Sequence, residues 1–170
     1  MNKAAMLEDE DIVSNTIIQG NVDLSKYQQD AYTAQRFYVK PALGKELYDK
    51  LVSDYGDNGS GLEGLYLELY EEYVKYLIIY SAGELYLKHA AYQVTNAGVI
   101  KARSESFESV DKLEIDFLME SCRGLYNMYK ADMFDWLKEN PLPEYKNVPV
   151  INSKTHTFGG WYLNTKLRRK

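Results

Sequence analysis

The sequence predicts a mainly α-helical bundle around one long central helix, followed by an extended C-terminal arm. Over most of residues 25–140, apolar residues recur every three or four positions, which is the spacing of one helix face. The last 26 residues hold six Lys or Arg and no Asp or Glu, and three of the four prolines lie at or just before them. With 45% hydrophobic and 26% charged residues, the 170-residue chain has the composition of one globular domain. We therefore expect a leader over 1–24, a helical-bundle domain over 25–140 and a basic arm over 141–170.

The first predicted helix begins at Asp23 or Ser25, because either side chain can cap a helix N-terminus. Its buried face is expected at Tyr27, Ala31, Ala34 and Tyr38. A residue that precedes proline disfavours the helical region, so we expect a kink or break at Lys40-Pro41. A second helix then starts at Pro41 and carries its apolar face on Leu43, Leu47, Tyr48 and Leu51.

The central helix is predicted from a capping box, Ser60 with Glu63, to about Gln93. A turn at residues 57–61 precedes it. Residues 73–80 are apolar on nearly every side, which indicates a helix covered by its neighbours. Residues 95–98 end this helix, and a loop with one short strand at Val99-Ile100 is expected to follow.

The last helix is expected from Asp111, with Glu114 completing a second capping box, to about Glu139. One face of it steps by three or four residues through Leu118, Cys122, Leu125, Tyr129, Met133 and Trp136. Pro141 and Pro143 stop this helix, and the arm follows. The single cysteine, Cys122, is expected in the core and excludes an internal disulfide framework, which fits a reducing compartment.

Charge divides the chain into two parts. Fourteen of the 20 Lys and Arg and all 25 Asp and Glu precede residue 145, so this part has a formal charge of −11, whereas the arm carries +6. So acidic a body argues against a reader of duplex DNA, which needs a basic face to neutralise phosphates. Acidic residues 8–11 occupy the place where a signal peptide would be apolar, and no run reaches the roughly 18 apolar residues of a membrane span.

No group of residues in the sequence forms a catalytic, cofactor or metal motif, so we predict a protein that is not an enzyme and needs no cofactor. Neither His89 nor His156 has Cys or carboxylates at ligand spacing. Glu68, Glu71 and Glu72 lack the Glu-x-x-His pattern of di-iron bundles and fit a solvated face. The serines lack a G-x-S-x-G context, and Gly59-Ser60-Gly61 lacks the lysine of a phosphate loop.

The sixteen tyrosines are the compositional oddity of the chain. A stacking platform for single-stranded nucleic acid would combine aromatics with basic residues. Here tyrosines such as Tyr66, Tyr70, Tyr73 and Tyr80 fall at core spacing in an acidic body, which favours core packing, with some of them at an oligomer surface.

The arm is predicted to bind a partner, because it carries large apolar groups that a purely solvated tail would not favour. Such a peptide can dock in a groove or add a strand to a neighbour, and it becomes ordered on binding. A plain disordered tail is the alternative. The predicted partner-binding residues are Phe158, Trp161, Tyr162, Leu163, Lys166, Arg168, Arg169 and Lys170.

The stretch from Ala34 to Tyr48, AQRFYVKPALGKELY, preceded by Gly20-Asn21-Val22-Asp23, resembles the N-terminal helical signature of head-to-tail connector (adaptor) proteins of tailed bacteriophages. The likeness is closest to the connectors of crAss-like phages of Bacteroides. The segments YQVTNAGV at residues 92–99 and MFDWL at 133–137 fit the same pattern, so the resemblance spans most of residues 20–140.

The resemblance implies a structural virion protein of the neck region, assembled in the host cytoplasm. Copies of the chain would form a cyclic ring below the portal protein, around the channel used for genome packaging and ejection, and would link the portal to the next tail or ring protein. DNA would pass through the lumen without sequence-specific binding, and no membrane would be involved. Connectors resemble one another in gripping the portal with a C-terminal extension, which agrees with the arm read from the residues.

A second hypothesis is a soluble helical interaction or regulatory module that uses its basic arm to bind a protein or nucleic acid. Salt separates the two hypotheses, because binding to phosphates weakens steeply with ionic strength. An arm anchored by Phe158 and Trp161 would be less sensitive to salt.

Overall fold

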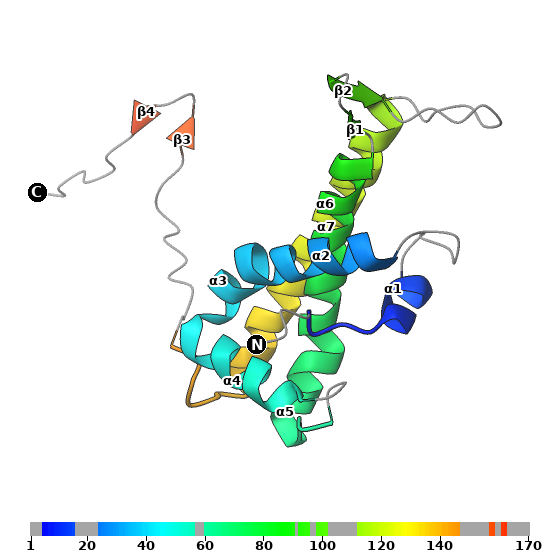
Figure 1. The fold of residues 1–170 in the computed structure, drawn as a ribbon. Coiled ribbons are helices and arrows are strands. Elements are labelled where there is room, and N and C mark those ends of the chain that lie inside the picture. The colour runs from blue at the N-terminus through cyan, green and yellow to red at the C-terminus, as the bar shows by residue number, and fades with distance from the viewer. Residues whose placement is uncertain are drawn as a thin grey trace, which may run out of the picture.

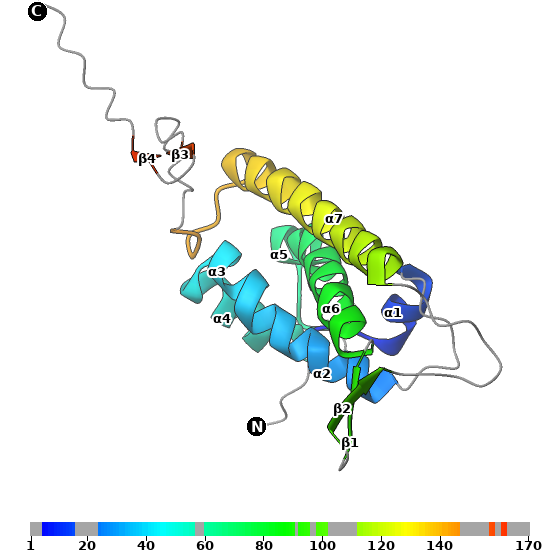
Figure 2. The same cartoon turned by 90° about the horizontal axis from the view of Figure 1, so that it is seen from above.

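The computed structural model describes residues 5–15, 24–56, 60–90, 92–95, 98–101, 112–146, 157–158 and 161–162, and these form a mainly α-helical bundle (Figure 1). Three long helical segments make up the bundle: α2 (Leu24–Ala34), α6 (Lys75–Ala90) and α7 (Lys112–Glu139). Helix α6 packs against both α2 and α7 and lies between them (Figure 2). The predicted fold class, a helical bundle around a long central helix, is confirmed.

The central helical segment runs without a break from Gly64 to Ala90. It comprises α5 (Gly64–Leu69), a π-helical turn η2 (Tyr70–Val74) and α6. Fully buried aliphatic side chains line it, which explains its position at the centre of the fold: Leu69, Val74, Leu77, Ile78 and Ile79.

The predicted start of the central helix is corrected by the structure. Glu63 is extended, with φ −137° and ψ 155°, and is itself the N-cap, without a side-chain capping bond. Leu62 is buried beside it, and Ser60 and Gly61 form a turn, so a Ser60–Glu63 capping box does not form. Gly64 has φ 56°, a conformation that favours glycine.

The predicted end of the central helix at Gln93 is also wrong. Helix α6 ends at Ala90, and β1 (Tyr92–Thr95) pairs antiparallel with β2 (Gly98–Lys101), with Gln93 opposite Ile100. The short strand expected at Val99-Ile100 is confirmed within β2. Its partner β1 was not predicted, because the apolar spacing of the helix continues into residues 92–94.

The kink or break expected at Lys40-Pro41 is wrong. Residues Gln35–Val39 form a π-helical turn, η1, in which the amide of Lys40 donates to the carbonyl of Gln35. Lys40 itself is helical, with φ −56° and ψ −44°. This wider turn accommodates the proline ring, which in a regular α-helix clashes with the carbonyl four residues earlier. The chain breaks instead at Gly44, with φ 78° and ψ 162°, after α3 (Lys40–Leu43).

The second predicted apolar face is confirmed across α3 and α4 (Lys45–Tyr55), because its four members are all buried: Leu43, Leu47, Tyr48 and Leu51. Helix α7 has the predicted extent. Its predicted face is buried at Met133 and Trp136 and half-buried from Leu118 to Tyr129. Cys122, expected in the core, is half-buried.

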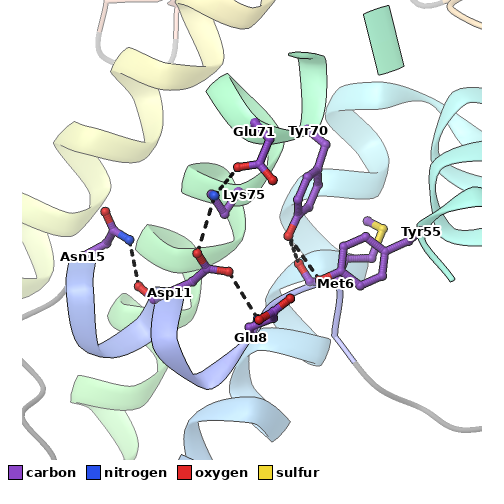
Figure 3. A network of polar contacts seen from close by, with 8 residues as sticks. All are labelled: Met6, Glu8, Asp11, Asn15, Tyr55, Tyr70, Glu71 and Lys75. Carbon is purple, nitrogen blue, oxygen red and sulfur yellow. Dashed lines mark hydrogen bonds and ion pairs between the residues drawn. The ribbon is translucent and has the colours of Figure 1, made fainter. Parts of the chain in front are cut away.

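The described part of the predicted leader packs into the core. Helix α1 (Asp9–Asn15) buries Ile12, and Met6 and Leu7 are buried before it. The amide of Met6 donates to Gln35 Oε1 at 2.8 Å. Tyr70 Oη donates to the carbonyl of Met6 at 3.1 Å (Figure 3). The N-terminal segment is therefore fixed by hydrogen bonds from both α2–η1 and the central helix.

Candidate partner-binding surfaces

Three of the eight predicted arm residues lie in a described element. Strands β3 (Thr157–Phe158) and β4 (Trp161–Tyr162) pair antiparallel, with Phe158 opposite Trp161. The Gly159-Gly160 pair between them is a dipeptide typical of two-residue hairpin loops, and it could have indicated this hairpin from the sequence. Leu163, Lys166, Arg168, Arg169 and Lys170 lie outside the described residues.

The root of the arm, residues 141–146, is held on the helical body. Leu142 is buried, and Tyr66 Oη donates to Glu144 Oε2 at 2.7 Å. Lys146, the first basic residue of the arm, lies 2.5 Å from Glu46 on α4. The arm therefore leaves the body from a fixed point between α4 and α5.

A row of exposed apolar side chains follows the outer side of α7. Leu113 is 75% exposed, Phe117 69% and Met128 47%. Steps of four, seven and four residues connect Leu113, Phe117, Gly124 and Met128, so they share the helix face turned away from the core residues. We call these four residues the α7 stripe. Exposed Asp116 and Glu120 flank it and give it an acidic margin.

A second apolar surface lies on η1 and α3. Phe37 is 74% exposed, next to exposed Arg36 and Pro41. The Arg36 guanidinium lies 5.8 Å from the centroid of the Tyr32 ring, which holds the cation beside the phenyl group. We call Arg36, Phe37 and Pro41 the Phe37 patch. Sequence reasoning missed it because Phe37 stands next to the buried positions of its helix.

The tyrosines predicted as core residues do pack in or against the core. Tyr70 is buried, while Tyr66, Tyr73 and Tyr80 are partly buried against it. The rings of Tyr76 and Tyr129 stack at 4.7 Å between centroids and join α6 to α7. These aromatics therefore stabilise the helix pairing.

Three buried phenols act as neutral hydrogen-bond donors. Burial raises the pKa of Tyr27 and of Tyr70, so both hydroxyl groups stay protonated. Tyr27 Oη donates to the carbonyl of Ile79 at 2.6 Å and connects α2 to α6. Burial likewise raises the pKa of Tyr126 to about 12, and its hydroxyl donates to the carbonyl of Tyr38 at 3.1 Å.

Ion pairs join the outer end of α6 to its neighbours. Burial opposes ionisation of Glu84, but hydrogen bonds from Arg123 at 2.5 Å and Lys88 at 2.9 Å lower its pKa. Asp30 Oδ1 lies 2.9 Å from His89 Nδ1, and burial raises the pKa of this carboxyl against the opposing effect of His89. Within the described ranges, no three His, Cys, Asp or Glu side chains converge as metal ligands would.

A cavity of about 400 Å³ lies between α1, α6 and α7. Its lining is mainly apolar, including Ile79, Leu87, Leu118 and Leu125 beside Cys122. Burial, with a smaller effect of Glu84, raises the pKa of the Cys122 thiol and favours its neutral form. A Cβ added at Gly83 would lie 3.3 Å from the sulfur atom, a tight contact that the thiol would have to relieve by moving a few tenths of an ångström.

A model of a family of unknown function, DUF6712, matches residues 39–155. The match covers more than half of the chain and includes all helices from α4 to α7. The chain belongs to this family. The Phe37 patch lies mostly before the matched region of the DUF6712 model, and both strands of the arm lie after it. No curated protein and no solved structure matches the chain. Among the helices that the structure describes, none is long and apolar enough to span a membrane.

Proposed function

We propose that this DUF6712 protein is a structural virion subunit, a head-to-tail connector of a tailed phage. Copies of it form a cyclic ring below the portal, in the neck of the virion, and join the portal to the next tail component around the DNA channel. In this role the chain binds other proteins and catalyses no reaction. Its assembly takes place in the host cytoplasm.

The observation that carries this proposal is the exposure of large apolar groups on ordered helices. Phe37, Leu113 and Phe117 each expose more than two thirds of their surface. Leu113 and Phe117 lie one helical turn apart and form a contiguous patch, and such patches mark contact surfaces. Phe37 belongs to the Ala34–Tyr48 stretch on which the resemblance to connector proteins rests.

The charge of the chain also supports a place around a DNA channel. The part before residue 145 has a formal charge of −11, and acidic walls repel phosphate, so transiting DNA would not adhere. The basic arm is then the segment suited to grip the portal. Its root is fixed at Leu142 and Glu144, so repeated copies around a ring would present their arms at regular positions and add their weak contacts.

Quantitative mass spectrometry of purified DNA-filled particles tests the function. We expect this chain at a fixed ratio to the portal protein, near that of a ring component. Absence from the particles would overturn the connector proposal and leave the regulatory module as the better hypothesis.

Deletion of residues 152–170 should abolish attachment to portal rings while the helical body stays folded. The arm root and its contacts at Leu142, Glu144 and Lys146 remain in this variant. We expect unchanged helical circular dichroism and loss of co-sedimentation with portal rings. As a matched control, replacing only Lys166, Arg168, Arg169 and Lys170 by Gln separates the cationic end from the aromatic anchors. Normal assembly of the truncated chain on portal rings would show that the arm is not the grip.

A further inference from the structure

We propose that the Phe37 patch of one copy docks onto the α7 stripe of the next copy, so that the chain associates head to tail. This inference rests on the ring of the proposed function and assigns its subunit interface. The two surfaces are different: the Phe37 patch lies on η1 and α3, whereas the α7 stripe lies on the side of α7 opposite Tyr126, whose hydroxyl bonds the carbonyl of Tyr38 on η1. A contact between two different surfaces is heterologous, and repeated heterologous contacts close into rings when the rotation allows.

The two surfaces have opposite charge. Beside Phe37 lie the exposed Arg36 and, one helical turn further on, Lys40. Asp49 lies 3.5 Å from Lys40 and 3.9 Å from Lys45, so this carboxylate offsets only part of the positive charge. The carboxylate of Glu46, next to Lys45 in the chain, is paired with Lys146 at 2.5 Å.

The charged residues around the α7 stripe are mainly acidic. Asp116 and Glu120 flank it, and the nearby cation Arg123 is already held by Glu84 at 2.5 Å. The positive charge of Arg123 is therefore neutralised by a carboxylate of the same chain. A basic rim around Phe37 thus meets an acidic rim around Phe117, which fixes the orientation of one copy on the next.

The α7 stripe also has a gap at Gly124, which an aromatic side chain could enter. A Cβ added at Gly124 would meet no atom within 4 Å, so this position is open. Phe117 lies two turns before Gly124 and Met128 one turn after it, and both side chains are exposed. An aromatic ring between them would be covered on both sides, with the adaptable methionine closing the contact. The exposed Phe37 is the ring that fits this gap.

Mixing two complementary variants tests the interface directly. Phe37→Asp destroys the Phe37 patch, and Phe117→Asp destroys the α7 stripe. Both positions are exposed, so the helical body should stay folded. In sedimentation velocity and native mass spectrometry at high protein concentration, we expect wild type to form oligomers and each variant alone to be at least about tenfold weaker in self-association. The mixture should form a one-to-one heterodimer that grows no further, because it retains one intact interface.

Two further variants serve as controls for this test. Gly124→Leu replaces a helical glycine by a helix former, so the fold should gain stability while the filled gap weakens association by about tenfold or more. Leu67→Asp, at an exposed apolar position of α5 outside both surfaces, should leave association unchanged.

Three results would overturn the interface: a wild-type chain that stays monomeric, self-association of Phe37→Asp at wild-type strength, or a mixture that does not pair. Failure of this interface is distinguishable from failure of the function. If the chain is present in particles but neither substitution weakens its self-association, the connector role stands and the proposed interface is rejected. If the variants pair as predicted but the chain is absent from particles, the interface stands and the connector role is rejected.

Discussion

Leu77→Ala should lower the free energy of unfolding by about 2–5 kcal/mol, among the largest single effects expected in this chain. Leu77 is fully buried on α6, the helix that packs against both α2 and α7. Truncation removes apolar surface from the core and leaves a cavity that the surrounding helices fill only in part. Urea unfolding followed by circular dichroism measures the change as a lower midpoint with an unchanged slope.

The matched control for this prediction lies on the same continuous helical segment. Leu65 on α5 is 42% exposed, so Leu65→Ala removes the same atoms from a position that already faces water. We expect a change within about 0.5 kcal/mol. Equal losses for Leu65→Ala and Leu77→Ala would contradict the placement of α6 at the centre of the bundle.

The helices that the sequence predicts well are those whose apolar spacing is long and regular. Residues 73–80 are apolar on nearly every side, which correctly indicates the covered central helix, and the spacing from Leu118 to Trp136 correctly indicates α7. Periodicity reports which face is buried, but it does not report backbone detail. The π turn at Gln35–Val39 lets the helix pass through Pro41, and neither its wider hydrogen-bond spacing nor its tolerance of proline leaves a mark in the apolar pattern.

The same limit explains which surfaces could be predicted. The arm stands out in the sequence because its charge and proline content differ from those of the body. Phe37 and Phe117 do not stand out in the sequence. Aromatic residues on helices usually belong to the core, and the sequence does not show that these two are exposed. Phe117 lies off the apolar face predicted from Leu118 to Trp136, but the spacing does not tell whether another element covers it. The structure shows that Phe117 is 69% exposed, whereas Met133 and Trp136 are buried.

The packing of the N-terminal segment also could not be predicted, because it depends on a polar residue in the core. Gln35 is 2% exposed, accepts a hydrogen bond from the amide of Met6 and donates one to Tyr48 Oη at 3.0 Å. From the sequence alone, a glutamine at this position would be predicted at the surface. Its two bonds connect three segments: the chain before α1, the α2–η1 helix and α4.

Gln35→Leu should therefore destabilise the protein although leucine is apolar and similar in size. The buried amide of Met6 would lose its acceptor, and each buried polar group left without a partner costs about 1–3 kcal/mol. We expect the free energy of unfolding, measured in urea, to fall by about 2–3 kcal/mol. Hydrogen exchange over residues 5–15 should become faster than this global loss of stability explains. The control is Gln29→Leu, which makes the same replacement at an exposed position of α2 and should change stability by less than about 0.5 kcal/mol. If Gln35→Leu were as stable as wild type, the N-terminal segment would not depend on this buried amide for its place in the fold.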